Sequence, residues 1–383
     1  MRAQNLLPKL VQKSLPAEMH QKRQQTLLAL VQASVSAEAL TVTGIGRALA
    51  TTGMTTAKHC IKRADRFLSN PLMHKEVDAV YQQLSALLMR NQGRPVILVD
   101  WTEMHHRNAH ALVASVPFAG RAQIIFTRVV DQTQLGSPQV QAQFIDALAV
   151  ILPPGCRPII VTDAGFQTSW CQAVRKQGWD FVTRVRNSVL FASSAGRWQR
   201  VSSLHAQAHS EAQDLGEVTL ARSNAQKVRL VVSARPRRGR HAKTLHGTTR
   251  NDTNQRKHRK SNSEPWVLST SISDYAADKV VALYRLRMGI EESFRDAKTT
   301  RFGLALEQAR GRADRIALLI LIAALACFAL QLLGAAAERA GAQYAFQANT
   351  IRKHRVLSLF RLGLELWRCN LELETLAQKR RIK

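Results

Sequence analysis

Cysteine is scarce in this chain, and the few cysteines lie far apart. Only 5 of the 383 residues are cysteine, at Cys60, Cys156, Cys171, Cys327 and Cys369. The number is odd and no Cys-x-x-Cys pair occurs, so the sequence supports neither a disulfide framework nor a zinc knuckle. The first residues, MRAQNLLPKLVQKS, also lack the apolar run of a signal peptide. We therefore expect a protein of a reducing, cytoplasmic compartment.

Acidic residues are also few. Asp and Glu number 27 against 55 Lys and Arg, which gives a formal net charge of +28. Such a field attracts polyanions, and nucleic acid is the first partner that it predicts, with an anionic membrane surface as the alternative. Apolar residues make up 45% of the chain, which excludes wholesale disorder.

Long apolar runs are confined to one segment. Residues 316–330 are apolar without a break, and Gln331 separates them from six further small or apolar residues. A membrane span needs about 20 apolar residues. Because Gln331 interrupts the run and no aromatic belt flanks it, we expect a buried core helix and no membrane partner, with a transmembrane helix as the alternative.

The first 90 residues have a helical pattern and contain a candidate DNA-binding pair of helices. Thr43 is expected to cap a short helix that ends near Ala50, and Thr55 or Thr56 to open a second that ends near Leu68. The second helix carries an apolar stripe and, beside it, a basic stripe of Lys58, Lys62, Arg63 and Arg66. A helix-turn-helix recognition helix has this pattern, and so does an ordinary amphipathic helix with a solvated face.

From Pro95 the spacing of apolar residues becomes typical of β-strands. Three apolar segments, PVILVDW, HALVASVPF and AQIIFTRVV, are followed by a helix near 140–152, the strand PIIVTDA, the helix TSWCQAVRKQG and the strand DFVTRVR. This order predicts an α/β fold in which helices pack on a mixed sheet. Residues 188–263 are irregular and rich in strands, which predicts an inserted β subdomain. Its last part, Arg235 to Lys260, holds ten Lys or Arg and predicts either a solvated loop or an arm that grips phosphates.

Two aspartates follow apolar strands in this acid-poor chain. Asp100 ends PVILVDW and Asp163 ends PIIVTDA. The carboxyl ends of strands line the ligand crevice of open α/β sheets, although a single Asp there more often caps a helix or forms a turn. The pair predicts two carboxylates at one site.

A third carboxylate is predicted on a helix over 277–298. At about 100° per residue, Tyr284, Arg287, Glu291 and Lys298 fall within roughly 60° of one another, whereas Glu292 points about 100° away from Glu291. Geometry therefore selects Glu291. Three carboxylates suit two Mg²⁺ ions, because hard cations take oxygen ligands and two of them can serve phosphodiester chemistry. Mn²⁺ is the expected substitute.

The motif Tyr284-x2-Arg287-x3-Glu291-x6-Lys298 resembles the signature of the insertion-sequence-four family of bacterial DDE transposases. VDWTE around Asp100, TDAGF around Asp163 and QANTIRKHRVLSLFRLG from Gln347 are similar to the same family, and most to its transposon-ten type. The resemblance implies a ribonuclease-H-like core interrupted by a β insertion. It also implies cut-and-paste transposition through a DNA hairpin.

Residue roles follow from this resemblance. Asp100, Asp163 and Glu291 would be the metal ligands and catalytic residues, and Tyr284, Arg287 and Lys298 would grip DNA phosphates. Trp266 would stack on a flipped base, with a core position as the alternative. The partners implied are the terminal inverted repeats, target DNA and a second copy of the chain in a synaptic homodimer, in a nucleoid-associated protein.

The expected domains are a helical DNA-end-binding domain with Lys58, Lys62, Arg63 and Arg66 as candidate contacts, two parts of the catalytic core, the insertion and a C-terminal helical region. The DNA-end-binding domain is expected to span 1–90, the two parts of the catalytic core 91–187 and 264–304, the insertion 188–263, and the C-terminal region 305–383. A regulatory DNA-binding protein without cleavage activity is the alternative function, and an intact acidic triad argues against it.

Overall fold

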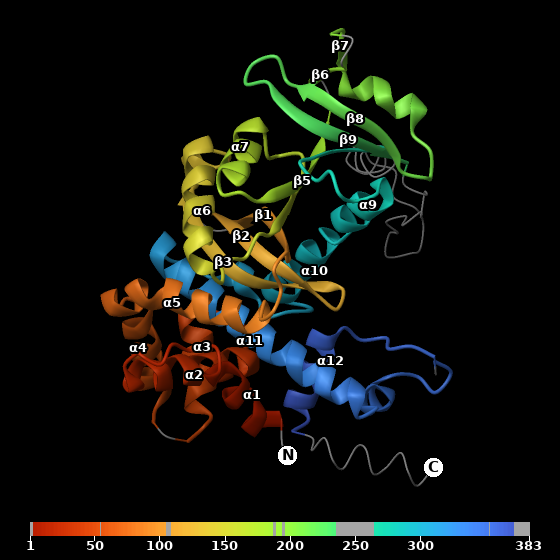
Figure 1. Ribbon diagram of the computed structural model, residues 1–383. Coiled ribbons are helices and arrows are strands. Elements are labelled where there is room, and N and C mark those ends of the chain that lie inside the picture. Colours follow the sequence, from red (N-terminus) through yellow and green to blue (C-terminus); the bar gives the residue numbers. More distant parts are fainter. Residues whose placement is uncertain are drawn as a thin grey trace, which may run out of the picture. The chain divides into compact units, whose positions relative to one another are not determined.

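The computed structural model describes residues 3–53, 55–104, 109–186, 189–193, 196–234, 264–351 and 353–370 (Figure 1). The chain divides into two compact units. Unit 1 comprises Met1–Cys156 and Met288–Lys383, and unit 2 comprises Arg157–Arg287.

Unit 1 begins with helices, as predicted. They are α1 (Ala3–Gln12), α2 (Gln21–Ser36), α3 (Val42–Ala50), α4 (Ala57–Leu68) and α5 (Pro71–Leu88). Thr56 precedes α4, as expected. The prediction that Thr43 caps the preceding helix is wrong. Thr41 caps α3 by accepting a hydrogen bond from the Gly44 amide (3.0 Å), and Thr43 lies inside the first turn. An N-cap oxygen must reach an amide two or three residues ahead, and Thr41 has that spacing.

Helices α3 and α4 approach each other closely. A Cβ added to Gly46 would lie 2.5 Å from the Cα of Ile61, so the crossing requires glycine at this position. Cys60, Ala64, Phe67 and Leu68 form the buried face of α4. The basic stripe consequently lies beside this buried face and not within it, as the sequence predicts.

Three strands follow, as predicted. They are β1 (Val96–Met104), β2 (Ala109–Phe118) and β3 (Arg121–Asp131), and they pair antiparallel in the order β3-β2-β1. α5 and α6 (Pro138–Ile151) pack against β3. A mostly buried run in each strand explains why the apolar segments of this region could be recognised in the sequence.

The long apolar segment forms α11 (Ala313–Arg339), which packs against β3, α1, α2 and α12 (Leu359–Arg368) within unit 1. Among the described residues it is the one helix long and apolar enough to cross a membrane, and 83% of its apolar window is buried inside the protein. The side chain of Gln123 on β3 donates a hydrogen bond to the Ala324 carbonyl of α11 (3.0 Å). α11 is therefore a core helix of unit 1, as the sequence predicts.

The crossing of α11 and α12 predicts a sensitive position. A Cβ at Gly334 would overlap the carbonyl oxygen of Leu359, so Gly334→Ala must push the two helices apart. Overpacking costs about 1–3 kcal/mol, against a helix-propensity gain of at most about 1 kcal/mol. We expect a net loss of about 1–2 kcal/mol in urea unfolding. Gly93→Ala is the control, because a Cβ there meets nothing within 4 Å. Equal unfolding midpoints for the two variants would contradict this packing.

Unit 2 contains the other predicted strands. Parallel β4 (Ile159–Thr162) and β5 (Asp180–Val185) are joined through α7 (Thr168–Lys176). Its strands have the order β4-β5-β10-β9-β8-β6-β7. The later elements are β6 (Leu190–Ala192), β7 (Trp198–Arg200), the 3-10 helix η2 (Val201–Gln207), β8 (Gln213–Leu220), β9 (Gln226–Ser233) and β10 (Trp266–Thr270). The basic segment Arg235 to Lys260 lies outside the described residues.

The single helix predicted over 277–298 is wrong, because the structure has two helices there. α9 (Ala277–Arg285) belongs to unit 2 and α10 (Met288–Lys298) to unit 1. Between them the amides of Leu286 and Arg287 donate to carbonyls only three residues back. Gly289, just inside α10, packs so closely on β3 that a Cβ would lie 2.8 Å from the Arg121 carbonyl oxygen.

The fold is a mixed α/β fold. Three antiparallel strands, a helix, a strand, a helix and a parallel strand follow one another along the chain, with helices on the sheet. This is the order expected of a ribonuclease-H-like core, so the predicted fold class is confirmed.

Candidate active site and DNA-binding surface

Asp100 lies in the middle of β1 and not at its end. The strand continues to Met104, which pairs with Ala109, and Asp100 itself lies opposite Val113. The prediction that Asp100 ends its strand is therefore wrong, because the polar residues after Trp101 still pair with β2. The carboxylate is half-buried and accepts a hydrogen bond from the Trp101 amide (2.9 Å).

Glu291 lies in the first turn of α10, on its exposed side. The opposite side packs on β3, where the hydroxyl of Ser293 accepts a hydrogen bond from the Ala122 amide (2.7 Å) and Asp296 pairs with Arg121 (2.6 Å). At 100° per residue, Glu291 lies about 160° from Gly289 at the centre of this packed side. The contacts with β3 thus turn Glu291 away from the core.

Lys298 connects the exposed side of α10 to β1. It lies about 20° from Glu291 around the helix and donates hydrogen bonds to the Thr102 hydroxyl (3.1 Å) and the Glu103 carbonyl. Alternate residues of a strand share a face, so Thr102 and Asp100 project from the same side of β1. Within unit 1, therefore, Asp100 and Glu291 lie on elements joined through Lys298.

Burial lowers the pKa of the Lys298 ammonium, and the charges of Glu103 and Glu307 partly offset this effect. The folded pKa therefore lies below the unfolded value. The charged form of Lys298 lowers the stability of the folded state at low pH, and this loss disappears as the pH rises from the folded pKa through the unfolded pKa. A phosphate near Lys298 would stabilise its charged form in the same way as the two glutamates.

Glu292 has a structural environment of its own. It pairs with Arg121 on β3 (3.6 Å) and with Arg295 one turn later on the same helix. Its carboxylate therefore belongs to the network that holds α10 on β3. This placement agrees with the helical-face argument that separates Glu292 from Glu291.

Asp163 directly follows β4 in unit 2, as predicted. Its half-buried carboxylate accepts a hydrogen bond from the Gly165 amide (2.8 Å), and its carbonyl accepts one from the Thr183 hydroxyl (3.0 Å). The first contact is a turn of the kind that Asp often forms after a strand. The turn and a metal-binding role are compatible, because an ionised carboxylate has further lone pairs to offer.

Tyr284 is buried near the end of α9, and burial raises the pKa of its hydroxyl. The positive charges of Arg287 and Arg184 act against this rise, and the negative charge of Asp163 adds to it. These four side chains consequently interact within unit 2. Sequence reasoning missed Arg184, although its place in the alternating strand DFVTRVR was a usable signal.

Arg184 is held near this group by Glu264. The Glu264 carboxylate pairs with Arg184 (3.3 Å), with Arg186 and with His205 (3.7 Å). Burial lowers the pKa of the Arg184 guanidinium, and the charge of Glu264 acts against this fall. The network places a partly buried positive charge beside Tyr284.

Trp266 begins β10 and is buried, with 6% of its surface exposed. Its ring meets the edge of Tyr284 at a centroid distance of 4.8 Å and an interplanar angle of 77°. Stacking on a flipped base requires an uncovered ring, so in this conformation Trp266 is a core residue. Base stacking stays a prediction, and it requires the ring to become exposed.

The three carboxylates predicted to bind divalent ions are divided between the two units. Asp100 and Glu291 are in unit 1, and Asp163 is in unit 2. Within either unit, no group of three His, Cys, Asp or Glu among the described residues is arranged to hold a metal ion. The donors themselves fit a hard cation, because all three are carboxylates.

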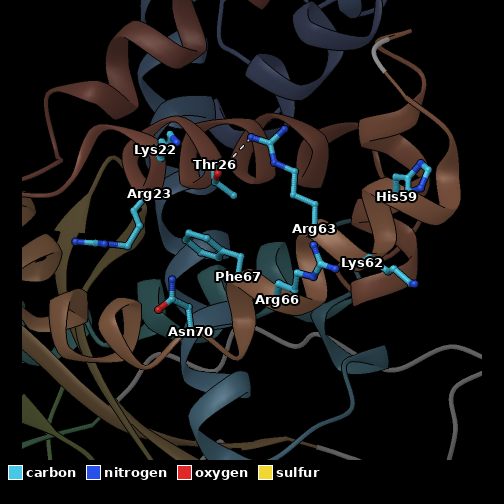
Figure 2. A pocket seen from close by; sticks show the side chains of 9 residues that line it. All are labelled: Lys22, Arg23, Thr26, His59, Lys62, Arg63, Arg66, Phe67 and Asn70. Atoms are coloured by element: carbon cyan, nitrogen blue, oxygen red, sulfur yellow. Dashed lines mark hydrogen bonds between the residues drawn. The ribbon is translucent and has the colours of Figure 1, made fainter.

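A basic hollow of about 490 Å³ lies between α2 and α4 in unit 1 (Figure 2). Of the four basic residues predicted on α4, three line it and Lys58 does not. Sequence reasoning missed the contribution of α2, since helical periodicity relates residues within one helix only. The lining residues are Lys22, Arg23, Thr26, His59, Lys62, Arg63, Arg66, Phe67 and Asn70.

Comparison with known proteins identifies the catalytic region. No curated protein matches the chain significantly. The family model described as "Transposase DDE domain" matches residues 91–328, which is more than half of the chain and includes Asp100, Asp163 and Glu291. This protein therefore belongs to the transposase DDE domain family.

Proposed function

We propose that this protein is a cut-and-paste DNA transposase that binds the terminal inverted repeats of its own element, excises the element and joins it to target DNA. The observation that carries the proposal is the DDE domain match over residues 91–328, which spans three carboxylates in the predicted pattern. Members of this family are metal-dependent enzymes that act on DNA. The formal charge of +28 supports a polyanionic substrate.

Asp100, Asp163 and Glu291 are proposed as the ligands of two Mg²⁺ ions, which Mn²⁺ can replace. When bound, such ions lower the pKa of an attacking oxygen and neutralise charge on the leaving one. The half-buried or exposed carboxylates leave oxygen atoms within reach of an ion. The link that Lys298 makes between α10 and β1 supports a shared role for Glu291 and Asp100.

Tyr284, Arg287 and Lys298 are proposed to hold the DNA backbone at the cleavage position. Arg287 supplies planar donors for phosphate oxygens, and Lys298 supplies a point charge. The interaction of Tyr284 with Arg287 keeps a phenol and a guanidinium together in unit 2. Holding the scissile phosphate in one orientation is the main contribution that a protein makes to phosphoryl transfer besides charge.

The proposed reaction is a series of phosphoryl transfers. Water first attacks a phosphodiester at the element's end, a new phosphorus–oxygen bond forms and the 3′ oxygen leaves as a hydroxyl. That hydroxyl attacks the opposite strand, which closes a hairpin and releases the flanking DNA. Water reopens the hairpin, and the 3′ hydroxyl finally attacks target DNA. Each step exchanges one phosphorus–oxygen bond for another.

The finer assignment is the insertion-sequence-four family and its transposon-ten type, supported by the spacing of Tyr284, Arg287, Glu291 and Lys298. Residues 1–90 are proposed to bind the DNA end, and residues 305–383 to contribute to a synaptic homodimer. The protein is proposed to act in the cytoplasm on the nucleoid. The competing function, a regulatory DNA binder, has no need of the three carboxylates.

Cleavage of a labelled duplex tests the proposal. A duplex that carries the inverted repeat bordering the gene is incubated with the protein and either Mg²⁺ or EDTA, then resolved on a denaturing gel. We expect a nicked strand and then a slower hairpin band with Mg²⁺, and neither band with EDTA. Binding without cleavage under both conditions would favour the regulatory DNA binder.

A further inference from the structure

The hollow between α2 and α4 is strongly basic. Six of its nine lining residues are Lys, Arg or His, and no Asp or Glu is among the described residues that line it. Eight of the nine side chains come from α2 and α4, which face each other across the space, and Asn70 caps the start of α5 (Figure 2). A concave surface of one charge sign raises the local concentration of the opposite charge, so the hollow suits an anion.

Part of the hollow is held in place by contacts within the protein. Arg63 on α4 donates to the Thr26 hydroxyl on α2 (3.2 Å), the bond drawn in Figure 2. Arg23 on α2 makes two hydrogen bonds to Glu76, at 2.6 and 2.7 Å. The first contact joins α4 to α2 and the second joins α2 to α5, so both reduce the ordering that a ligand would have to impose.

Other cations of the hollow remain available to a ligand. Lys22, Lys62 and Arg66 are exposed, and their side chains make no hydrogen bond or ion pair with the residues that the structure describes. Phe67 at the hollow is only 5% exposed, so it offers no face on which a base could stack. The available groups are therefore those that hold a backbone phosphate.

We propose that this hollow holds neighbouring backbone phosphates of duplex DNA, so that Lys22, Lys62 and Arg66 position the duplex and do not read its bases. The inference rests on the proposed function and deepens it. It differs from the behaviour of a recognition helix, whose side chains discriminate between base edges in the major groove. It also assigns α2 a share in DNA binding.

The test measures binding of the full chain to two fluorescein-labelled duplexes of unrelated sequence at several salt concentrations. For Lys62→Ala/Arg66→Ala we expect the slope of log affinity against log salt to fall by about two, since each lost phosphate contact removes about one. At 0.1 M salt this corresponds to a loss of about a hundredfold, equal on both duplexes. Lys75→Ala/Arg90→Ala is the charge-matched control, because both residues are exposed and lie outside the hollow. Its slope should change by less than one.

Three results obtained with a chain that binds DNA would overturn the inference alone. Unequal losses on the two duplexes would indicate base reading, and equal slopes for the test and control variants would place the hollow away from DNA. Saturable binding of pyrophosphate that Lys62→Ala/Arg66→Ala abolishes, with duplex affinity retained, would identify a site for small anions. If the unmodified chain fails to bind either duplex, the proposed function itself fails, and the inference fails with it.

Discussion

Glu291→Gln is expected to lower strand cleavage by about a thousandfold and to leave DNA binding nearly unchanged. A metal ion contributes several kcal/mol of charge stabilisation to a phosphoryl-transfer transition state, and about 4 kcal/mol corresponds to about a thousandfold in rate. Binding persists because the affinity for DNA comes from Lys and Arg. Asp100→Asn and Asp163→Asn should behave in the same way. Cleavage rates and duplex affinities are measured on the same preparations.

Glu292→Gln is the matched control, since it makes the same chemical change one residue away. Glu292 pairs with Arg121 and Arg295, and a partly exposed pair contributes about 1 kcal/mol or less. Its cleavage rate should therefore stay within about fivefold of the parent. An inactive Glu292→Gln beside an active Glu291→Gln would show that the assignment of the helix face is wrong.

Trp266→Ala is expected to reduce the free energy of unfolding by about 3–5 kcal/mol, the usual cost of truncating a large buried ring. The ring is buried and packs on Tyr284, so its removal leaves a cavity beside that side chain. Urea unfolding followed by circular dichroism measures the change. Trp266→Phe should recover much of the loss, because it retains a ring against Tyr284.

Trp198→Ala provides the comparison, since Trp198 is another tryptophan of unit 2 and is only half-buried. Its loss should be clearly smaller than that of Trp266→Ala. A different pattern would support base stacking: parental stability for Trp266→Ala, together with normal nicking and a reduced hairpin yield. In that case the ring would leave the core when DNA binds.

Much of the fold could be predicted from the sequence because local periodicity dictates it. The three strands that begin with β1 are marked by runs of apolar residues, and α11 by a single long run. The end of β1 could not be predicted, because the polar residues after Trp101 are held in the strand by pairing with β2. The periodicity of one segment does not show which other strand it pairs with.

The break between α9 and α10 has a similar cause. The helical pattern over 277–298 is continuous, and the contact of Gly289 with Arg121 on a strand distant in sequence is invisible in it. The choice of Glu291 survives this break, because Glu291 and Glu292 lie on the same short helix. The relation of Glu291 to Tyr284 and Arg287 does not follow from a single helix face, since Tyr284 lies on α9, Arg287 lies between the two helices and Glu291 lies on α10.

The basic hollow could be predicted even less from the sequence, because it is formed by tertiary packing. Lys62 and Arg66 could be named from their spacing on one helix, whereas Lys22 and Arg23 enter the site only because α2 packs alongside. Three-dimensional structure was thus needed to turn a basic stripe into a concave site.

Manganese binding tests most directly whether Asp100, Asp163 and Glu291 form one metal site. Free Mn²⁺ is counted by electron paramagnetic resonance in a titration of the complex between the chain and a pre-cut DNA end. We expect about two Mn²⁺ per chain beyond those bound by the DNA alone, as a two-metal site requires, and none in the variant Asp100→Asn/Asp163→Asn/Glu291→Gln. The same number of bound ions in the variant and in the parent would contradict the account.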